Sequence, residues 1–366
     1  MDGIPRHFST ERVQAAKDRV TELYHQQNTD RPCYRVYDYP PEGVLSPVEQ
    51  AIYDPDRSLQ WALNWFERCS HYEGDFIPSV GPVDFVIGIP SAFGCEIVQP
   101  QGAHPWVKPL ITDCSEIYRL KKPKATDGLL GKALEATRCL VDKTGDSYPI
   151  RMVNIQGPLT NAGYLLGDSE LLLALYDHPK EMHTLLDMIT DVMIEFVHAQ
   201  RALVGEFNPI VHCPDWIPDG YGIGIPDDYA GVLSPALYEE FALPYNNRLS
   251  HEFGGIGIHS CGHSEGVWDV FLKHENLRVV NFELTDNSFE KAVELFSGKA
   301  VIAPHAPMRQ KKYPRMMDMV RHVVAAKKEN TALIITLERH ARATDDPFRE
   351  EEDGFEEAYD FLRGRV

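Results

Sequence analysis

Short β-rich runs alternate with amphipathic helical segments along most of this chain, and this alternation constrains its fold more than any other feature. Apolar and β-branched runs predict strands at residues 33–37, 83–89, 150–155, 210–213, 256–259, 279–282, 300–304 and 333–337. Helical spacing of apolar residues predicts helices over 129–134, 182–196 and 237–249, the last beginning at the cap Ser234-Pro235. Alternation of this kind implies a parallel sheet.

The number of strand–helix units favours a closed barrel over an open sheet. Seven or eight units over roughly 290 residues fit an α/β fold of the (β/α)8 TIM type. No Gly-x-Gly-x-x-Gly follows the first strand, which disfavours a dinucleotide-binding fold. We therefore expect a barrel domain over 81–366, preceded by a helical extension over 1–80 that packs on it.

Composition excludes several classes of function. The chain has 366 residues and a net charge of -19, which argues against nucleic acid or an anionic membrane as a partner. No run reaches the roughly 18 to 20 apolar residues of a membrane helix, and residues 1–6 lack a signal-peptide core. The seven cysteines are scattered singly, as is typical of a reducing cytoplasm.

The segment 257–263, Gly-Ile-His-Ser-Cys-Gly-His, contains an imidazole and a thiol two residues apart. Side chains at i and i+2 of a strand point to the same side, so His259 and Cys261 can aim at one point. One nitrogen and one sulfur form half of a zinc site. The alternative is a buried thiol beside a histidine that bonds to main chain.

Other polar residues follow predicted strands and are expected at the same end of the barrel. Gln156, His212, Glu283 and His305 are candidates for substrate binding. Asp215 and Asp228, with the neighbouring Asp227, are candidates for an acid or a metal partner, although Asp227 and Asp228 also suit a capping role. Tyr221 lies in the Gly-rich segment 219–224, which we interpret as a mobile lid that carries a catalytic tyrosine.

An ordered set of short motifs resembles the uroporphyrinogen decarboxylase superfamily. The motifs are Phe93-Gly94-Cys95-Glu96, Pro105-Trp106-Val107-Lys108-Pro109, Gln156-Gly157-Pro158-Leu159-Thr160, Asp227-Asp228 ahead of Leu233-Ser234-Pro235, Phe241-x-x-Pro244-Tyr245 and His259-x-Cys261-Gly262. The resemblance implies a TIM-type barrel with its site at the carboxyl ends of the strands. The family contains metal-free porphyrinogen decarboxylases and zinc methyltransferases that work with a corrinoid.

The decarboxylase branch is the less favoured interpretation. It requires an Arg-rich stretch near the N-terminus, where this chain keeps Arg31 and Arg35, and an aspartate at the position of Phe85. Asp84 is one residue away and would face the opposite side of its strand. A decarboxylase of a tetrapyrrole or a smaller carboxylate is the alternative function.

The methyltransferase branch carries His-x-Cys and a third ligand, usually Cys, on the last strand. This chain has no cysteine after Cys261, and the resemblance assigns the third position to His340, or less well to Glu338. An exposed His340 in a charged loop is the competing interpretation. The expected activity is zinc-dependent transfer of a methyl group between a methoxy compound, amine or thiol and a corrinoid (cobalamin).

The resemblance also implies the partners. No Asp-x-His-x-x-Gly cobalamin motif occurs, so the corrinoid is expected on a separate protein, and a homodimer is one candidate assembly because the family often pairs barrels. Zinc has two candidate roles: to bind a thiol acceptor, or to act as a Lewis acid on a methoxy oxygen. The nitrogen- and oxygen-rich ligand set favours the second.

Overall fold

Parallel strands form the centre of the molecule. The computed structural model describes residues 7–27, 31–40, 54–82, 86–100, 105–210, 216–305, 312–340 and 354–365. Within these residues the strands are β1 (Cys33–Tyr39), β2 (Ile97–Val98), β3 (Trp106–Val107), β4 (Ile150–Arg151), β5 (Phe207–Asn208), β6 (Ile223–Pro226), β7 (Ile256–Ser260), β8 (Leu277–Glu283), β9 (Val301–His305) and β10 (Ile334–His340). Apart from the antiparallel β2–β3 pair, every strand pair is parallel.

Hydrogen bonds close the parallel strands into a ring. Strands β6, β7, β8 and β9 form one sheet in that order, β4 pairs with β5, and β10 pairs with β1. An Ile302–Leu333 bridge joins β9 to the start of β10, and Gly224 N donates to Pro209 O between β5 and β6. The ring closes through residues 75–80, which bond to β1 at one end and to β4 at the other. The fold is therefore the predicted (β/α)8 TIM type.

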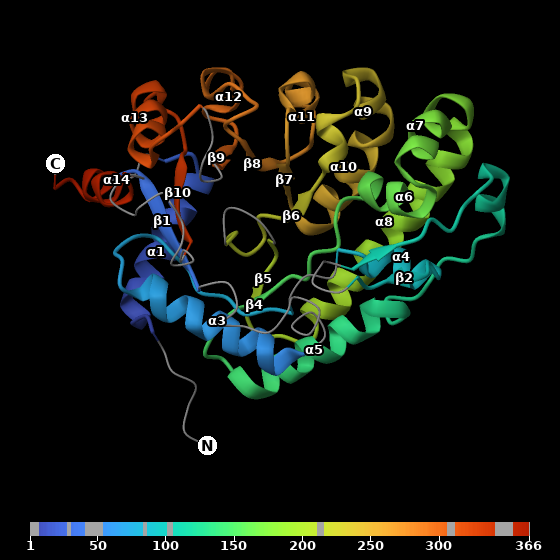
Figure 1. The fold of residues 1–366 in the computed structure, drawn as a ribbon, viewed down its shortest axis with the longest axis horizontal. Coiled ribbons are helices and arrows are strands. Elements are labelled where there is room, and N and C mark those ends of the chain that lie inside the picture. The colour runs from blue at the N-terminus through green and yellow to red at the C-terminus, as the bar shows by residue number, and fades with distance from the viewer. Residues whose placement is uncertain are drawn as a thin grey trace.

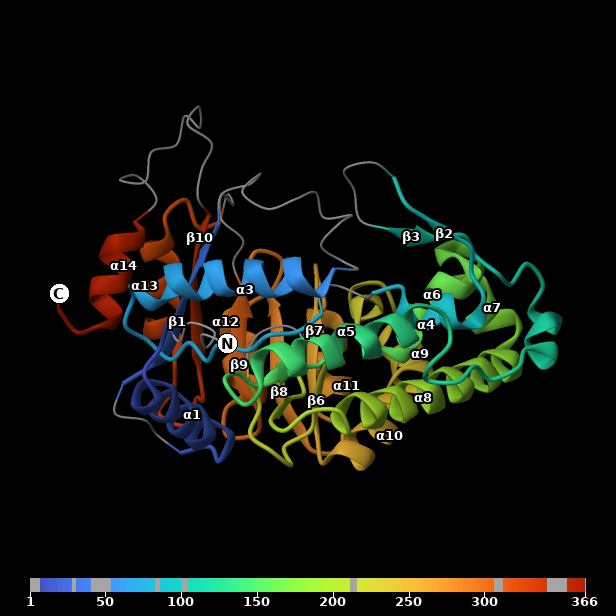
Figure 2. The ribbon, with the colours of Figure 1, turned by 90° about the horizontal axis from the view of Figure 1, so that it is seen from below.

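Helices surround this ring (Figure 1). They are α1 (Thr10–Tyr24), α3 (Pro55–Ser70), α4 (Gly88–Phe93), α5 (Gly128–Thr144), α6 (Pro158–Leu166), α7 (Asp168–Asp177), α8 (Pro179–Arg201), α9 (Pro235–Phe241), α10 (Leu243–Phe253), α11 (Trp268–Phe271), α12 (Phe289–Phe296), α13 (Met316–Ala326) and α14 (Phe355–Leu362), with 3-10 turns η1 (Cys114–Arg119), η2 (Asp228–Gly231) and η3 (Glu265–Val267). Figure 2 shows α1 at the amino-terminal end of β1. None of the helices in the described residues has the length and apolar character to cross a bilayer.

The region expected as a helical extension contributes a strand to the ring. Strand β1 pairs with β10 over its whole length, from Cys33–Ile334 to Tyr39–His340. Its Tyr37 packs against α3, where its ring contacts Trp65. Residues 1–80 thus include part of the barrel. Without β1, strand β10 would be an edge strand with unpaired backbone groups. The expected boundary at residue 80 therefore cuts through the barrel itself.

Strand β6 was not predicted from the sequence. Residues 219–224 were interpreted as a Gly-rich lid, yet β6 begins at Ile223 and pairs with β7. Glycine is required here by packing: a Cβ on Gly224 would lie 2.4 Å from Cγ1 of Ile210. The glycines therefore mark close approach of neighbouring strands rather than mobility.

Two other elements differ from the prediction. The strand expected over 83–89 overlaps helix α4, which begins at Gly88 and has Pro90 in its first turn, where proline is tolerated; residues 83–85, including Asp84 and Phe85, lie outside the described residues. The helix expected over 237–249 is two helices, since Pro244 has no amide hydrogen and α9 ends at Phe241 before α10 begins. Ser234 caps α9 as expected, accepting a hydrogen bond from Leu237 N.

Candidate metal centre

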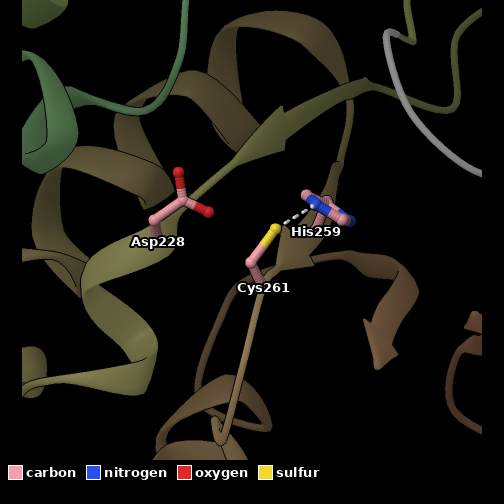
Figure 3. Close-up of side chains that lie close together, drawn as sticks. All are labelled: Asp228, His259 and Cys261. Atoms are coloured by element: carbon pink, nitrogen blue, oxygen red, sulfur yellow. Dashed lines mark hydrogen bonds between the residues drawn. The ribbon is translucent and has the colours of Figure 1, made fainter. Parts of the chain in front are cut away.

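Asp228, His259 and Cys261 converge at the carboxyl ends of the parallel strands, which we call the barrel mouth (Figure 3). Each offers one ligand atom, and these atoms all lie within 4.8 Å of one another. His259 Nε2 lies 3.2 Å from Cys261 Sγ. Within the part of the chain that the structure describes, this is the group whose spacing suits a metal ion.

The pairing of β6 with β7 brings these residues together. Pro226 is opposite His259 in the register, and Asp227 N donates to His259 O at 2.7 Å. Asp228 follows as the first residue of η2, so its carboxylate lies beside the end of β7. Cys261 is the first residue beyond β7 and lies two residues after His259, on the same side of the chain.

Asn281 fixes the orientation of the His259 ring. Its amide nitrogen donates to Ala303 O, which identifies its oxygen as the atom facing His259 Nδ1. Nδ1 therefore carries the hydrogen, and Nε2 keeps its lone pair on the side of Cys261. Burial lowers the pKa of His259, so the imidazole is neutral, as a metal ligand must be. Asn281 is a residue that the sequence analysis missed; an Asn within the apolar run 279–282 was the available signal.

Cys261 and Asp228 supply the other two donors. Cys261 is exposed at the mouth, although neighbouring side chains partly shield its thiol. That shielding raises its pKa to about 11, and the charges of Asp228 and Glu283 act in the same direction. Asp228 Oδ1 is buried and has no hydrogen-bond partner. A cation would satisfy this oxygen and would stabilise the thiolate, so the three side chains fit a metal ion.

The neighbouring Asp227 is a structural residue rather than a donor at the mouth. It is buried, and its carboxylate accepts hydrogen bonds from Tyr238 Oη at 2.7 Å and from Asn246 Nδ2 at 3.0 Å. Burial raises the pKa of Asp227 to about 6. These bonds to α9 and α10 hold the backbone from which Asp228 projects.

Strands β8, β9 and β10 carry a histidine and two carboxylates near their carboxyl ends. Along β9, His305 is on the same face as Val301 and Ala303, which pack in the barrel interior. His305 Nδ1 lies 3.3 Å from Oε1 of Glu338, on β10. Glu338 was predicted as an alternative metal ligand, but in the structure it contacts His305 and is not part of the three-residue group. Glu283, at the end of β8, is close enough to influence Cys261.

Several predicted site residues cannot be placed. His212 and Asp215 lie outside the described residues, and so does the side chain of His340. A ligand role for His340 therefore stays a prediction. Asp228 lies beside His259 and Cys261, where the resemblance places a third ligand from the last strand. Strand β6 precedes Asp228 and adjoins β7 in the ring, whereas β10 does not.

Tyr221 was predicted to be catalytic, and the structure places it away from the metal centre. Tyr221 precedes β6, whereas the metal centre follows it. Its ring packs edge-on against Tyr24 of α1, and the Arg278 guanidinium lies 4.8 Å from its ring centre. Tyr221 is thus at the amino-terminal end of the barrel, where it holds α1 against the strands.

Gln156, one of the four substrate-binding candidates, follows β4 at the mouth. It is buried, with 7% of its surface exposed, and its Oε1 has no hydrogen-bond partner. The β4–α6 loop that carries it contacts the end of β6, where Gly157 N donates to Pro226 O at 2.7 Å. Gln156 therefore lies on the loop that adjoins the segment bearing Asp228.

Comparisons with known proteins identify relatives of part of the chain. Residues 54–206 match the family model described as Uroporphyrinogen decarboxylase (URO-D). A uroporphyrinogen decarboxylase from Xanthomonas oryzae is 29% identical over 174 residues, or 46% of this chain and 44% of the relative. The same enzyme from Xylella fastidiosa is 27% identical over the same shares. The chain thus matches less than half the length of these curated relatives.

A solved structure matches nearly the whole chain. A methyltransferase from Methanosarcina mazei covers 95% of this chain and 99% of its own length, with a TM-score of 0.68 and 17% sequence identity. At this identity the match shows a common fold.

Proposed function

We propose that this chain is a methyltransferase of the uroporphyrinogen decarboxylase superfamily. It transfers a methyl group between a small substrate and a corrinoid carried on a separate protein, with zinc at the barrel mouth. The observation that carries the proposal is the convergence of Asp228, His259 and Cys261 within 4.8 Å. The common fold with a methanogen methyltransferase is consistent with it.

The three donors suit zinc. Catalytic zinc sites use nitrogen, sulfur and oxygen donors from three protein residues and leave a fourth position for substrate. Here His259 Nε2, Cys261 Sγ and the Asp228 carboxylate would hold the ion, and the unpartnered Asp228 Oδ1 favours a cation. When bound, zinc supplies a Lewis acid that polarises a methoxy oxygen.

The chain's own residues prepare the site for this chemistry. Asn281 keeps the hydrogen of His259 on Nδ1, and Cys261 gives up its proton as the cation arrives. When the methyl group leaves an ether, the electron pair of the broken carbon–oxygen bond stays on the oxygen, which then takes a proton. His305, oriented by Glu338, is suited to donate that proton.

The first test is metal analysis of the purified protein. We expect one zinc per chain in the wild type and a loss of at least half of it in His259→Ala, Cys261→Ser and Asp228→Asn. Cys139→Ser, which changes a half-buried thiol on α5, should keep its zinc. His340→Ala tests whether β10 supplies a further donor. Zinc contents that are equal in all variants would reject the site.

The second test is methyl transfer. Zinc-loaded protein is mixed with cob(I)alamin and a methoxylated aromatic, and methylcobalamin is followed by its absorbance. The reverse assay uses methylcobalamin and a thiol. We expect activity with the methoxy compound. Activity with the thiol alone would reject the Lewis-acid role, and inactivity with both would reject methyl transfer.

A metal-free decarboxylase is the second candidate, favoured by the match of residues 54–206 to the decarboxylase family model. Substrate carboxylates would need free guanidinium groups. In the structure Arg31 forms two hydrogen bonds with Asp75, both of 2.7 Å, and Arg35 is buried and donates to Thr336. Release of carbon dioxide from a porphyrinogen by metal-free protein would favour this candidate.

A further inference from the structure

Gln156 has a backbone conformation that glutamine rarely adopts. Its φ is +55°, in the left-handed region, where a non-glycine residue costs on the order of 1 kcal/mol. Such residues persist where the surrounding structure over-determines them, and they cluster at binding sites. The side chain at this position is therefore a candidate for a role that glycine could not fill.

The surrounding loop is held rigidly around this residue. Asn154 Oδ1 accepts a hydrogen bond from Gln156 N at 3.1 Å. Asn161 Nδ2 donates to both Ile155 O and Gly157 O, at 2.7 and 2.9 Å. The loop therefore keeps its conformation without help from the Gln156 amide group.

The loop leaves a group of buried oxygen atoms without partners. Gln156 Oε1, Thr160 Oγ1 and Asn161 Oδ1 are buried, and none has a hydrogen-bond partner. More than nine in ten buried polar groups in proteins are paired, either within the protein or with ordered water, so these three oxygens call for a ligand or a water molecule as a partner. An oxygen acceptor of this kind calls for a hydrogen-bond donor, N–H or O–H.

The loop that carries these residues adjoins the segment that bears Asp228. A Cβ on Gly157 would be 2.8 Å from Pro226 O and 3.8 Å from the Asp227 Cβ, so the loop is pressed against the end of β6. On the following helix, Gly163 lies against the ring of Tyr229, the residue after Asp228. Gln156 and Asp228 are thus carried by adjoining segments at the mouth.

We propose that Gln156 determines substrate specificity: its Oε1 accepts a hydrogen bond from a hydroxyl or amino group next to the methylated atom of the substrate. The role of this group in methyl transfer rests on the function proposed above. The favoured substrate class is then an aromatic or aliphatic methyl ether with a neighbouring hydroxyl or amine, rather than a bare ether.

The test compares binding of 2-methoxyphenol and methoxybenzene, which differ by one hydroxyl, by calorimetry on the full chain without corrinoid. We expect the wild type to bind 2-methoxyphenol about tenfold more tightly, as one added hydrogen bond to a buried acceptor implies. Gln156→Met keeps the approximate shape but replaces the amide oxygen with a much weaker acceptor, so it should lose the preference. Gln156→Gly also relieves the backbone strain and should lose the preference while being at least as stable.

Gln26→Met is the matched control. Among the described residues, Gln26 is the other glutamine with a left-handed φ, +57°, and its Oε1 is also unpartnered, but it follows α1 at a distance from the mouth. The Gln26→Met variant should keep the tenfold preference for 2-methoxyphenol. A wild type without preference, or a Gln156→Met variant that keeps it, would overturn the assignment. Each comparison is repeated on metal-free protein, where the preference should persist even if the zinc proposal fails.

Discussion

His259 and Asn281 are opposite each other in the β7–β8 register, and Asn281 accepts the hydrogen on Nδ1 of His259. The Asn281 amide nitrogen is itself bound to Ala303 O of β9, so the amide cannot turn over without losing a bond. Three adjacent strands therefore determine which nitrogen of His259 faces Cys261. This arrangement is the usual support of a metal-binding imidazole.

Replacing Asn281 by Leu should weaken metal binding without removing a ligand. The variant keeps the volume of the side chain but leaves the imidazole free to change tautomer and to rotate. We expect zinc affinity to fall about 10- to 100-fold, measured by competition with a chromophoric chelator. Asn247→Leu, which changes a half-buried amide on α10 that accepts from Glu275 N, is the control and should bind zinc as the wild type does. Equal affinities in both variants would contradict the supporting role.

Replacing Gly157 by Ala should disturb the mouth through the backbone. The new Cβ would lie 2.8 Å from Pro226 O, so the loop or the end of β6 must shift. We expect a loss of about 1–3 kcal/mol in the free energy of unfolding, from urea titration. A weaker zinc affinity should accompany it, because Asp228 follows β6. Gly266→Ala is the control, since no heavy atom lies within 4 Å of its added Cβ. A Gly157→Ala protein as stable as this control would argue against tight contact between the loop and β6.

The sequence was sufficient to predict the barrel because long apolar runs define most of its strands. Strands β1, β7, β8, β9 and β10 lie within a few residues of their predicted positions. Strand β6 was missed because two of the six residues from Tyr221 to Pro226 are glycines, which carry no hydrophobic pattern. A side chain at Gly222 would clash with Gly255, and one at Gly224 would clash with Ile210. Only the folded chain brings these residues together.

The metal centre could be predicted only in part, because some of its residues are close in sequence and others are not. The i, i+2 spacing of His259 and Cys261 is local, so the pattern alone indicates that they share one side of the chain. The third donor, Asp228, depends on which strand adjoins β7. Because β6 is not evident in the sequence, Asp228 is only a candidate for an acid or a metal partner there, and the resemblance assigns the third ligand to the last strand. Asn281 depends on the β7–β8 register in the same way.

Substitutions at Tyr221 test whether this residue has a structural role at the amino-terminal end of the barrel. Tyr221→Phe keeps the ring that packs against Tyr24 and Arg278, so zinc content and methyl transfer should equal those of the wild type. Tyr221→Ala removes that ring and should cost about 2 kcal/mol of stability, measured by urea unfolding. Zinc content in this variant should still be normal at temperatures where it is folded. A Tyr221→Phe protein that is stable but inactive would restore a catalytic role.

His274 should make the stability of the protein pH-dependent. It is buried in the network beneath the metal centre, where Nδ1 donates to Phe271 O and Nε2 lies 3.4 Å from Asn246 Nδ2. Burial lowers its pKa from 6.5 to about 4. Between pH 6.5 and pH 4 the unfolded chain therefore binds a proton here that the folded chain does not, so acidification favours unfolding. The slope from this one group approaches about 1.4 kcal/mol per pH unit.

The difference between wild type and His274→Gln isolates this contribution. Asp227 in the same network has a pKa raised from 3.8 to about 6, so its contribution to stability is present at low pH and is lost as the pH rises through 6, opposite in sign to that of His274. The contribution of Asp227 is present in both proteins, so it cancels in the difference between their free energies of unfolding. Urea unfolding at pH 7, 6, 5 and 4.5 should show the wild type losing stability relative to the variant at each step downward. A His274→Gln curve that runs parallel to that of the wild type would show that His274 is protonated equally in the folded and unfolded states.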